Sequence, residues 1–175
     1  MREFEQVAFD FDAACRAAGV RYVLVGGIAV LAWGQPRTTM DIDSIVSLRK
    51  DQVEGLVASL VRHRLRARGE DFHDSLDVTV HAEDSAFHVD VKLSDSEETE
   101  RELERAREES FEGGRLRIAS PEDTIAWKLR FGSPQDVADA RSIWIRQQGR
   151  LDLQALKGTA RRLGVADALA DIMSE

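Results

Sequence analysis

Residues 22–46, YVLVGGIAVLAWGQPRTTMDIDSIV, decide the fold that we expect for this chain of 175 residues. Their order of β-branched, small and turn-forming residues predicts a strand, a short helix, a turn and a second strand. Because alternate side chains on a strand share a face, Asp41 and Asp43 should project together, with Cα atoms about 7 Å apart, while Ile42 points into a core. Two carboxylates directed at one point favour Mg²⁺, which also takes water and substrate phosphates as ligands.

The pair Gly26-Gly27 lies where the first strand passes into the short helix. Glycine lets the backbone approach a ligand closely, and a helix N-terminus offers unpaired N–H groups together with the positive end of the helix dipole. Phosphate oxygens are the ligands that suit such a site. Metal and phosphate are therefore predicted to meet at one place, between the glycines and the two aspartates.

The rest of the chain alternates between helical and strand periodicity. Apolar residues three and four apart and N-cap serines before proline predict helices, and β-branched alternation predicts strands. The predicted helices span residues 4–18, 26–33, 51–60, 97–109, 124–130 and 134–148, with one or two closing helices over 152–163 and 165–173. The predicted strands span residues 20–25, 41–47, 76–81 and 87–93, followed by a small hairpin around Gly113-Gly114.

These elements predict an α+β fold, in which a small mixed β-sheet is flanked by helices and followed by a C-terminal helical part. The division falls near Ser120, where strands give way to helices. We therefore expect a core over residues 1–119 and a helical part over residues 120–175 packed on it, with one single domain as the alternative. Apolar helical positions favour core packing over a base-stacking platform for Trp33, Trp127 and Trp144.

Composition and missing motifs restrict the function classes. The net charge of −8 and the pI of about 5.1 argue against a broad nonspecific nucleic-acid surface. The sequence lacks the apolar run of a membrane span and the features of a signal peptide, so we expect a cytoplasmic protein without a membrane partner. The single Cys15 allows no internal disulfide. A P-loop, a dinucleotide-binding glycine motif, a serine nucleophile elbow and a zinc-binding histidine spacing are also absent from the sequence.

The glycine and aspartate motifs resemble those of the nucleotidyltransferase superfamily related to DNA polymerase β. That family carries an apolar residue, Gly, Gly or Ser, a spacer, Asp-x-Asp and a later third carboxylate. Here thirteen residues separate Val25-Gly26-Gly27 from Asp41-Ile42-Asp43. The segment GGIAVLAWGQPRTTMDID is most similar to the abortive-infection type toxins and their small relatives, although Ser44 stands where the family usually has an apolar residue.

The resemblance implies that Asp41, Asp43 and Asp90 form a carboxylate triad for two Mg²⁺ ions. Asp90 is expected mid-strand, on the polar face of residues 87–93. One ion would lower the pKa of an acceptor hydroxyl, and the other would neutralise the triphosphate and the departing pyrophosphate. Gly26 and Gly27 would cradle the β- and γ-phosphates.

Four further residues are candidates for nucleotide binding. The segment SPEDTIAWKL resembles an element of the abortive-infection type family in which a lysine reaches the nucleotide phosphates, which implies that role for Lys128; a solvated helix lysine is the alternative. Asp136 and Asp139 lie on one helix face and resemble the family's late Asp-x-x-Asp motif, although Asp136 also suits the first turn of a helix. Arg37 either clamps a phosphate or pairs with an acid near the turn.

The resemblance therefore implies a Mg²⁺-dependent nucleotidyltransferase that moves a nucleoside monophosphate from an NTP to a hydroxyl group. As a toxin it would modify RNA, such as a tRNA end, or a protein side chain, and would have an antitoxin as its partner. An antibiotic nucleotidyltransferase with a small-molecule acceptor is the enzyme alternative, because lincosamide and aminoglycoside nucleotidyltransferases also combine a glycine motif with Asp-x-Asp. A non-catalytic, antitoxin-like binding module of the same fold is the second alternative.

Overall fold

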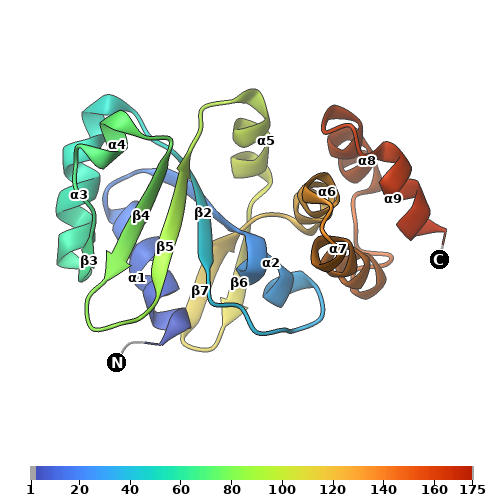
Figure 1. Cartoon of the computed structure of the whole chain (residues 1–175), viewed down its shortest axis with the longest axis horizontal. Coiled ribbons are helices and arrows are strands. Elements are labelled where there is room, and N and C mark those ends of the chain that lie inside the picture. Colours follow the sequence, from blue (N-terminus) through green and yellow to red (C-terminus); the bar gives the residue numbers. More distant parts are fainter. Residues whose placement is uncertain (1–2, 175) are drawn as a thin grey trace.

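The computed structural model describes residues 3–174 and contains a seven-stranded mixed sheet in the order β3-β4-β5-β2-β1-β7-β6 (Figure 1). β1 pairs antiparallel with β2, whereas β2 pairs parallel with β5 and β1 pairs parallel with β7. The other neighbours are antiparallel, which confirms the predicted mixed sheet. The strands span Arg21–Val25 (β1), Ile42–Ser47 (β2), Leu65–Arg66 (β3), Asp77–Ala82 (β4), His88–Leu93 (β5), Arg107–Phe111 (β6) and Gly114–Ile118 (β7).

Helices cover both faces of this sheet. α1 (Phe4–Ala17) and α3 (Val53–Arg62) pack together on one face, and α5 (Glu97–Arg105) packs against β1 and β2 on the other. The last four helices form a group beside the sheet, where α6 contacts both α2 and α8 (Figure 1). The remaining helical segments are α2 (Gly26–Trp33), the 3₁₀ turn Lys50–Gln52, α4 (Asp71–Asp74), α6 (Pro121–Phe131), α7 (Pro134–Arg146), α8 (Leu153–Arg162) and α9 (Ala166–Met173). None of the helices in the described part of the chain combines the length and apolar character that a membrane crossing needs.

The two serine-proline signals start helices where the sequence predicts them. Ser120 accepts a hydrogen bond from the Asp123 backbone N–H at the start of α6. Ser133 does the same for Asp136 at the start of α7, and the Asp136 carboxylate accepts the Ser133 N–H in return. Such a reciprocal cap satisfies backbone donors that the first turn leaves free. These caps fix where α6 and α7 begin, and α6 in turn forms part of the wall of the functional site described below.

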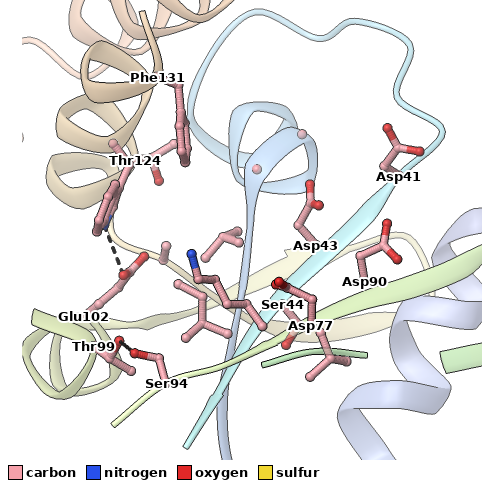
Figure 2. Close-up of a pocket in the computed structure, with 18 of the residues that line it drawn as sticks. Asp41, Asp43, Ser44, Asp77, Asp90, Ser94, Thr99, Glu102, Thr124 and Phe131 are labelled. Atoms are coloured by element: carbon pink, nitrogen blue, oxygen red, sulfur yellow. Dashed lines mark hydrogen bonds between the residues drawn. The ribbon is translucent and has the colours of Figure 1, made fainter. Parts of the chain in front are cut away.

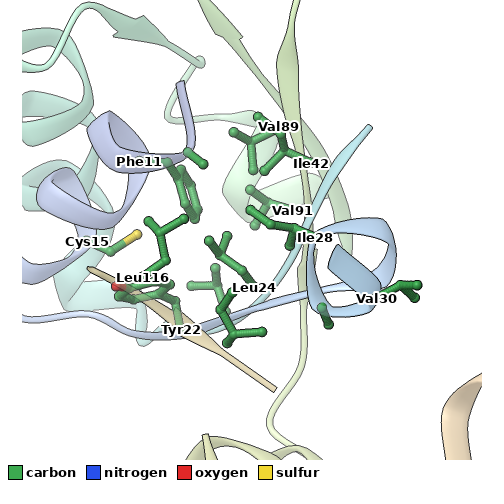
Figure 3. Close-up of a cluster of buried hydrophobic side chains, with 14 of the residues drawn as sticks. Phe11, Cys15, Tyr22, Leu24, Ile28, Val30, Ile42, Val89, Val91 and Leu116 are labelled. Carbon is green, nitrogen blue, oxygen red and sulfur yellow. The ribbon is translucent and has the colours of Figure 1, made fainter. Parts of the chain in front are cut away.

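The main core fills the space between the sheet and the α1–α3 layer and continues among α2 and the C-terminal helices; Figure 3 shows the part of it around α1, α2 and the strands. Phe11, Leu24, Ile42 and Val91 are almost completely shielded from solvent there. Strand alternation places every second residue of β2 in this core, so the intervening Asp43 faces the opposite side of the sheet. The fold thus needs one face of β2 for stability and leaves the other for the carboxylates.

Ser44 is the exception on the core face of β2. It is 1% exposed, and within residues 3–174 its hydroxyl has no hydrogen-bond partner. An unsatisfied buried hydroxyl costs about 1–3 kcal/mol, so Ser44→Ala is expected to raise the free energy of unfolding by about 1 kcal/mol in urea titrations. Ser47→Ala serves as the control, because the partly exposed Ser47 hydroxyl bonds to Glu100 and Arg21. A loss of stability in Ser44→Ala would contradict the assignment of an unsatisfied group.

The predicted helix over residues 97–109 is too long. α5 ends at Arg105, and Ala106 takes an extended ψ of 140° before β6 begins at Arg107. The charged residues of β6 suit a helix locally, but β6 pairs with β7 across the predicted Gly113-Gly114 turn. Pairing with a neighbouring strand satisfies the backbone groups of these residues and outweighs their helical propensity.

Candidate active site

Three aspartates meet on the face of the sheet opposite the main core. The parallel register of β2 and β5 places Asp43 directly beside Asp90, and Asp41 lies one residue before β2 begins. Figure 2 shows the three side chains directed toward the same end of a cleft. The sequence predicts this convergence only for Asp41 and Asp43; the sheet topology adds Asp90.

The electrostatics of this cluster favour a cation. Burial raises the pKa of Asp43 above its ordinary value, and the charges of Asp41 and Asp90 raise it further. The Thr79 hydroxyl donates to Asp90 Oδ1 at 3.0 Å, and His88 Nε2 lies 3.5 Å from Asp90 Oδ2. The raised pKa of Asp43 shows that the three carboxylates repel one another in the metal-free protein. A bound cation would relieve this repulsion.

The donor set suits a hard metal ion that shares its ligands with a substrate. As the side chains lie, no group of three histidine, cysteine, aspartate or glutamate residues among residues 3–174 is arranged to hold a metal ion by itself. Mg²⁺ commonly binds through one or two carboxylates and completes its shell with water and substrate phosphates. Asp41, Asp43 and Asp90 fit that mode of binding better than a closed protein cage.

The glycine pair lies against the aspartates. Gly26 has a φ of +63°, and a Cβ at this position would overlap the carboxylate of Asp43. A Cβ on Gly27 would overlap the Thr39 hydroxyl. Both glycines open α2, so the bare N-terminus of that helix and the carboxylate cluster share one space.

Arg37 and Lys128 both line the cleft, and each is bound by a carboxylate from α7. Asp139 accepts hydrogen bonds from Arg37 Nε at 3.0 Å and Nη2 at 2.9 Å. Lys128 Nζ lies 2.7 Å from Asp136 Oδ1 and 3.1 Å from Asp139 Oδ2. Arg37 therefore pairs with an acid, as one of its two predicted roles required. Lys128 is largely buried, which excludes the alternative of a solvated helix lysine.

The cleft has a volume of about 750 Å³, which lies within the range of about 300–1,000 Å³ usual for small-molecule sites. The sheet forms its floor, and α5 and α6 form one wall. Trp127 lies in that wall and is only partly buried, so the predicted core position is wrong for this tryptophan, whereas Trp33 is buried in the core as predicted. The indole N–H of Trp127 donates to Glu102 of α5 at the edge of the cleft.

Comparison with known proteins assigns the fold and the family. Residues 11–165 match the model of the family described as nucleotidyl transferase of unknown function (DUF2204). The chain belongs to this family. The superfamily predicted from the glycine and aspartate motifs is therefore confirmed. No curated protein matches this DUF2204 chain.

Solved structures share the fold of this DUF2204 nucleotidyl transferase at low sequence identity. The antibiotic-resistance factor ANT(2'')-Ia aligns over 94% of this chain and 93% of its own, with a TM-score of 0.60 and 14% identity. An antigenic nucleotidyltransferase-like protein from Paracoccidioides brasiliensis aligns over 97% and 92%, with a TM-score of 0.52 and 16% identity. The lincosamide antibiotic adenylyltransferase LnuA, bound to lincomycin, aligns over 81% and 98%, with a TM-score of 0.51 and 15% identity.

The cleft of the DUF2204 protein collects most of the residues predicted from sequence. The seven that line it are Asp41, Asp43, Asp90, Gly26, Gly27, Arg37 and Lys128. The other two, Asp136 and Asp139, bind the cations of that set. Sequence reasoning did not single out Lys92 and Glu102, and it assigned Trp127 to the core, yet all three line the cleft. Lys92 follows Asp90 on the same polar strand face, and that alternation was the available signal for it.

Proposed function

We propose that this nucleotidyltransferase moves a nucleoside monophosphate from a Mg²⁺-bound NTP to a hydroxyl group of an acceptor. One observation carries the proposal: the register pair Asp43 and Asp90, with Asp41, converges beside the bare N-terminus of α2. Carboxylates recruit the cation and helix N–H groups recruit phosphate, and nucleotidyl transfer needs both at one phosphorus atom.

Each residue then has a distinct task. Gly26 and Gly27 receive β- and γ-phosphate oxygens on their N–H groups, while Asp41 and Asp43 would hold the metal. When bound, Mg²⁺ polarises the acceptor hydroxyl and offsets the charge of the triphosphate and of the departing pyrophosphate. Asp90, which Thr79 orients, takes the hydroxyl proton as the acceptor oxygen bonds to the α-phosphorus and the bond from that phosphorus to the bridging oxygen of the β-phosphate breaks.

Arg37 and Lys128 steady the triphosphate in the cleft. Both cations line the cleft, and Lys128 lies close enough to lower the pKa of Asp43. Asp136 and Asp139 act as positioning residues for these cations rather than as groups that touch the nucleotide. A cationic side chain that is already held in position loses less conformational entropy when the nucleotide binds.

A small polar compound is the acceptor class that we propose. The cleft is of small-molecule size, and the net charge of −8 opposes a long contact with RNA. ANT(2'')-Ia is known in complex with adenylyl-2''-tobramycin, and LnuA with lincomycin, which supports a small acceptor for this fold. A toxin of the abortive-infection type, acting on tRNA or a protein in the cytoplasm under control of an antitoxin, is the second candidate and rests on the motif wording of residues 26–43.

Thermal unfolding with each of the four NTPs, with and without Mg²⁺, tests the proposal. A ligand at 100 times its Kd adds about 2.7 kcal/mol, and each kcal/mol raises the melting temperature of a chain of this size by about 2–4 °C. We expect at least one NTP to produce this rise only with Mg²⁺ in the wild type, and none to do so in the double variant Asp41→Asn/Asp43→Asn. The control is Asp74→Asn/Asp171→Asn, which removes two exposed carboxylates outside the cleft. An equal rise in the Asp41→Asn/Asp43→Asn variant would contradict the metal site.

A further inference from the structure

One end of the cleft forms a recess between α5 and α6 that the reaction steps above leave unused. We define the α5–α6 recess by its lining residues Thr99, Glu102, Thr124, Trp127 and Phe131. Figure 2 shows Glu102 and Phe131 on one side of the cleft and the three aspartates on the other. The recess therefore opens onto the same space as the proposed metal site.

Aromatic rings form one side of the recess. The rings of Trp127 and Phe131 are stacked, with centroids 5.9 Å apart and an interplanar angle of 26°. Phe131 is 70% exposed, which is unusual for a large apolar side chain on a packed helix. The two residues lie four apart on α6 and present their rings toward the cleft. A planar apolar surface of this kind suits a flat ring as its ligand.

A buried carboxyl group lies against the indole. Glu102 is 2% exposed, and its Oε2 accepts a hydrogen bond from Trp127 Nε1 at 3.2 Å. Burial, with the neighbouring charge of Asp123, raises the pKa of Glu102 to about 8. Within residues 3–174 this is the hydrogen bond described for Glu102, and it uses Oε2, which leaves Oε1 to a ligand. A polar atom in this position can bond to a ligand at little cost in desolvation.

The strand order places the recess on the donor side of the cleft. β1 leads into the Gly26-Gly27 turn, α5 packs against β1 and β2, and α6 packs against α2. Asp77 and Thr79 line the cleft from β4, which lies beyond β5 on the far side of the aspartates. A triphosphate at the glycines, with its α-phosphorus at Asp43, thus has the recess on its own half of the sheet and leaves the β4 half to the acceptor.

We propose that the α5–α6 recess binds the nucleobase of the NTP, stacked on Trp127 and hydrogen-bonded to Glu102. This inference rests on the function proposed above and adds how the donor is chosen. Stacking on an aromatic side chain holds any base, because every base has a π-face. Glu102 bonds to the polar edge of the base, whose donors and acceptors differ among the four NTPs. Trp127 therefore supplies affinity and Glu102 supplies the preference for one base.

Calorimetric titration of the wild type with the four NTPs and with inorganic tripolyphosphate, all with Mg²⁺, tests the assignment. In Trp127→Leu we expect the affinity for NTPs to fall by about 5- to 150-fold, which corresponds to the loss of one base-stacking contact, while the affinity for tripolyphosphate is unchanged. Trp127→Phe keeps an aromatic ring and should retain most of the NTP affinity that Trp127→Leu loses. In Glu102→Leu the spread of affinity among the four NTPs should narrow by about 2- to 10-fold, the effect of one hydrogen bond.

Trp144→Leu is the matched control, because Trp144 lies on α7 and outside the cleft lining. Unchanged NTP affinity in Trp127→Leu, with tripolyphosphate still bound, would overturn the recess assignment and leave the proposed function standing. Equal weakening of NTP and tripolyphosphate would also overturn it, since the base would then play no part. If neither NTP nor tripolyphosphate bound the wild type, the proposed function would fail and the recess assignment with it.

Discussion

Replacing Asp43 by asparagine is expected to reduce nucleotidyl transfer by about 10³-fold or more, because a metal ligand supplies several kcal/mol of transition-state stabilisation. The same change should stabilise the metal-free protein. The ionised carboxylate of Asp43 is partly buried and faces the charges of Asp41 and Asp90, and asparagine keeps the shape without the charge. Release of pyrophosphate measures the first effect, and thermal unfolding in a chelating agent measures the second.

The pH dependence of stability distinguishes the removal of the Asp43 charge from a change in side-chain packing. The pKa of Asp43 is raised in the folded protein, so the folded state binds more protons than the unfolded state between the two pKa values. Stability is therefore lost as pH rises from the ordinary aspartate range through the raised pKa, and Asp43→Asn should lack that loss. Asp74→Asn is the control, because Asp74 is exposed on α4. A melting temperature of Asp43→Asn below that of the wild type without metal would refute the argument.

Asp139→Ala is expected to cause the largest loss of stability. Asp139 is 3% exposed and bonds to both Arg37 and Lys128, so its removal leaves Arg37 without its acidic partner and Lys128 with Asp136 alone. Breaking a buried ion pair from one side costs about 3–5 kcal/mol, which corresponds to a fall of roughly 6–20 °C in the melting temperature. Thermal unfolding of the wild type and of Asp139→Ala at neutral pH measures this fall in melting temperature.

Acid titration gives this prediction a second observable. Burial by itself would raise the pKa of Asp139, but hydrogen bonds from Arg37, Gln135 and Lys128 outweigh it and hold the pKa below its ordinary value. The stability that the Asp139 carboxylate contributes is complete above the pKa that this group has in the unfolded chain. It is lost as pH falls through the lower pKa of the folded state. The difference between wild type and Asp139→Ala should therefore shrink in acid. A difference that stays constant down to low pH would show that packing, not charge, is responsible.

The sequence was most informative where its signals were local. Strand alternation around Ile42, the glycines at the start of α2 and the serine-proline caps depend on residues within a few positions of each other, and the structure confirms each of them. The placement of Asp90 beside Asp43 needed the strand order, and only the resemblance to a known family supplied it beforehand. The local signals predicted an α+β fold, and the resemblance implied that it is a nucleotidyltransferase fold.

The parts that the sequence could not provide depend on contacts between distant elements. Trp127 occupies an apolar position on its helix, yet it lines a cleft that residues of α5, α6 and the sheet form together. Glu102 belongs to a run of charged residues that suggests a solvent-facing helix, yet it is buried. β6 forms because β7 is available to pair with it. Helical periodicity identifies the buried face of an element but not the partner that covers it.

The register between β2 and β5 ties assembly of the site to correct folding. A slip of one residue in this parallel pair would turn Asp90 toward the core and direct Val89 or Val91 into the cleft. An unpaired carboxylate among apolar side chains is costly, so misaligned chains are disfavoured by the same residue that serves the reaction. Asp90 therefore helps to select the correct strand register. Few folded molecules should carry a misassembled site.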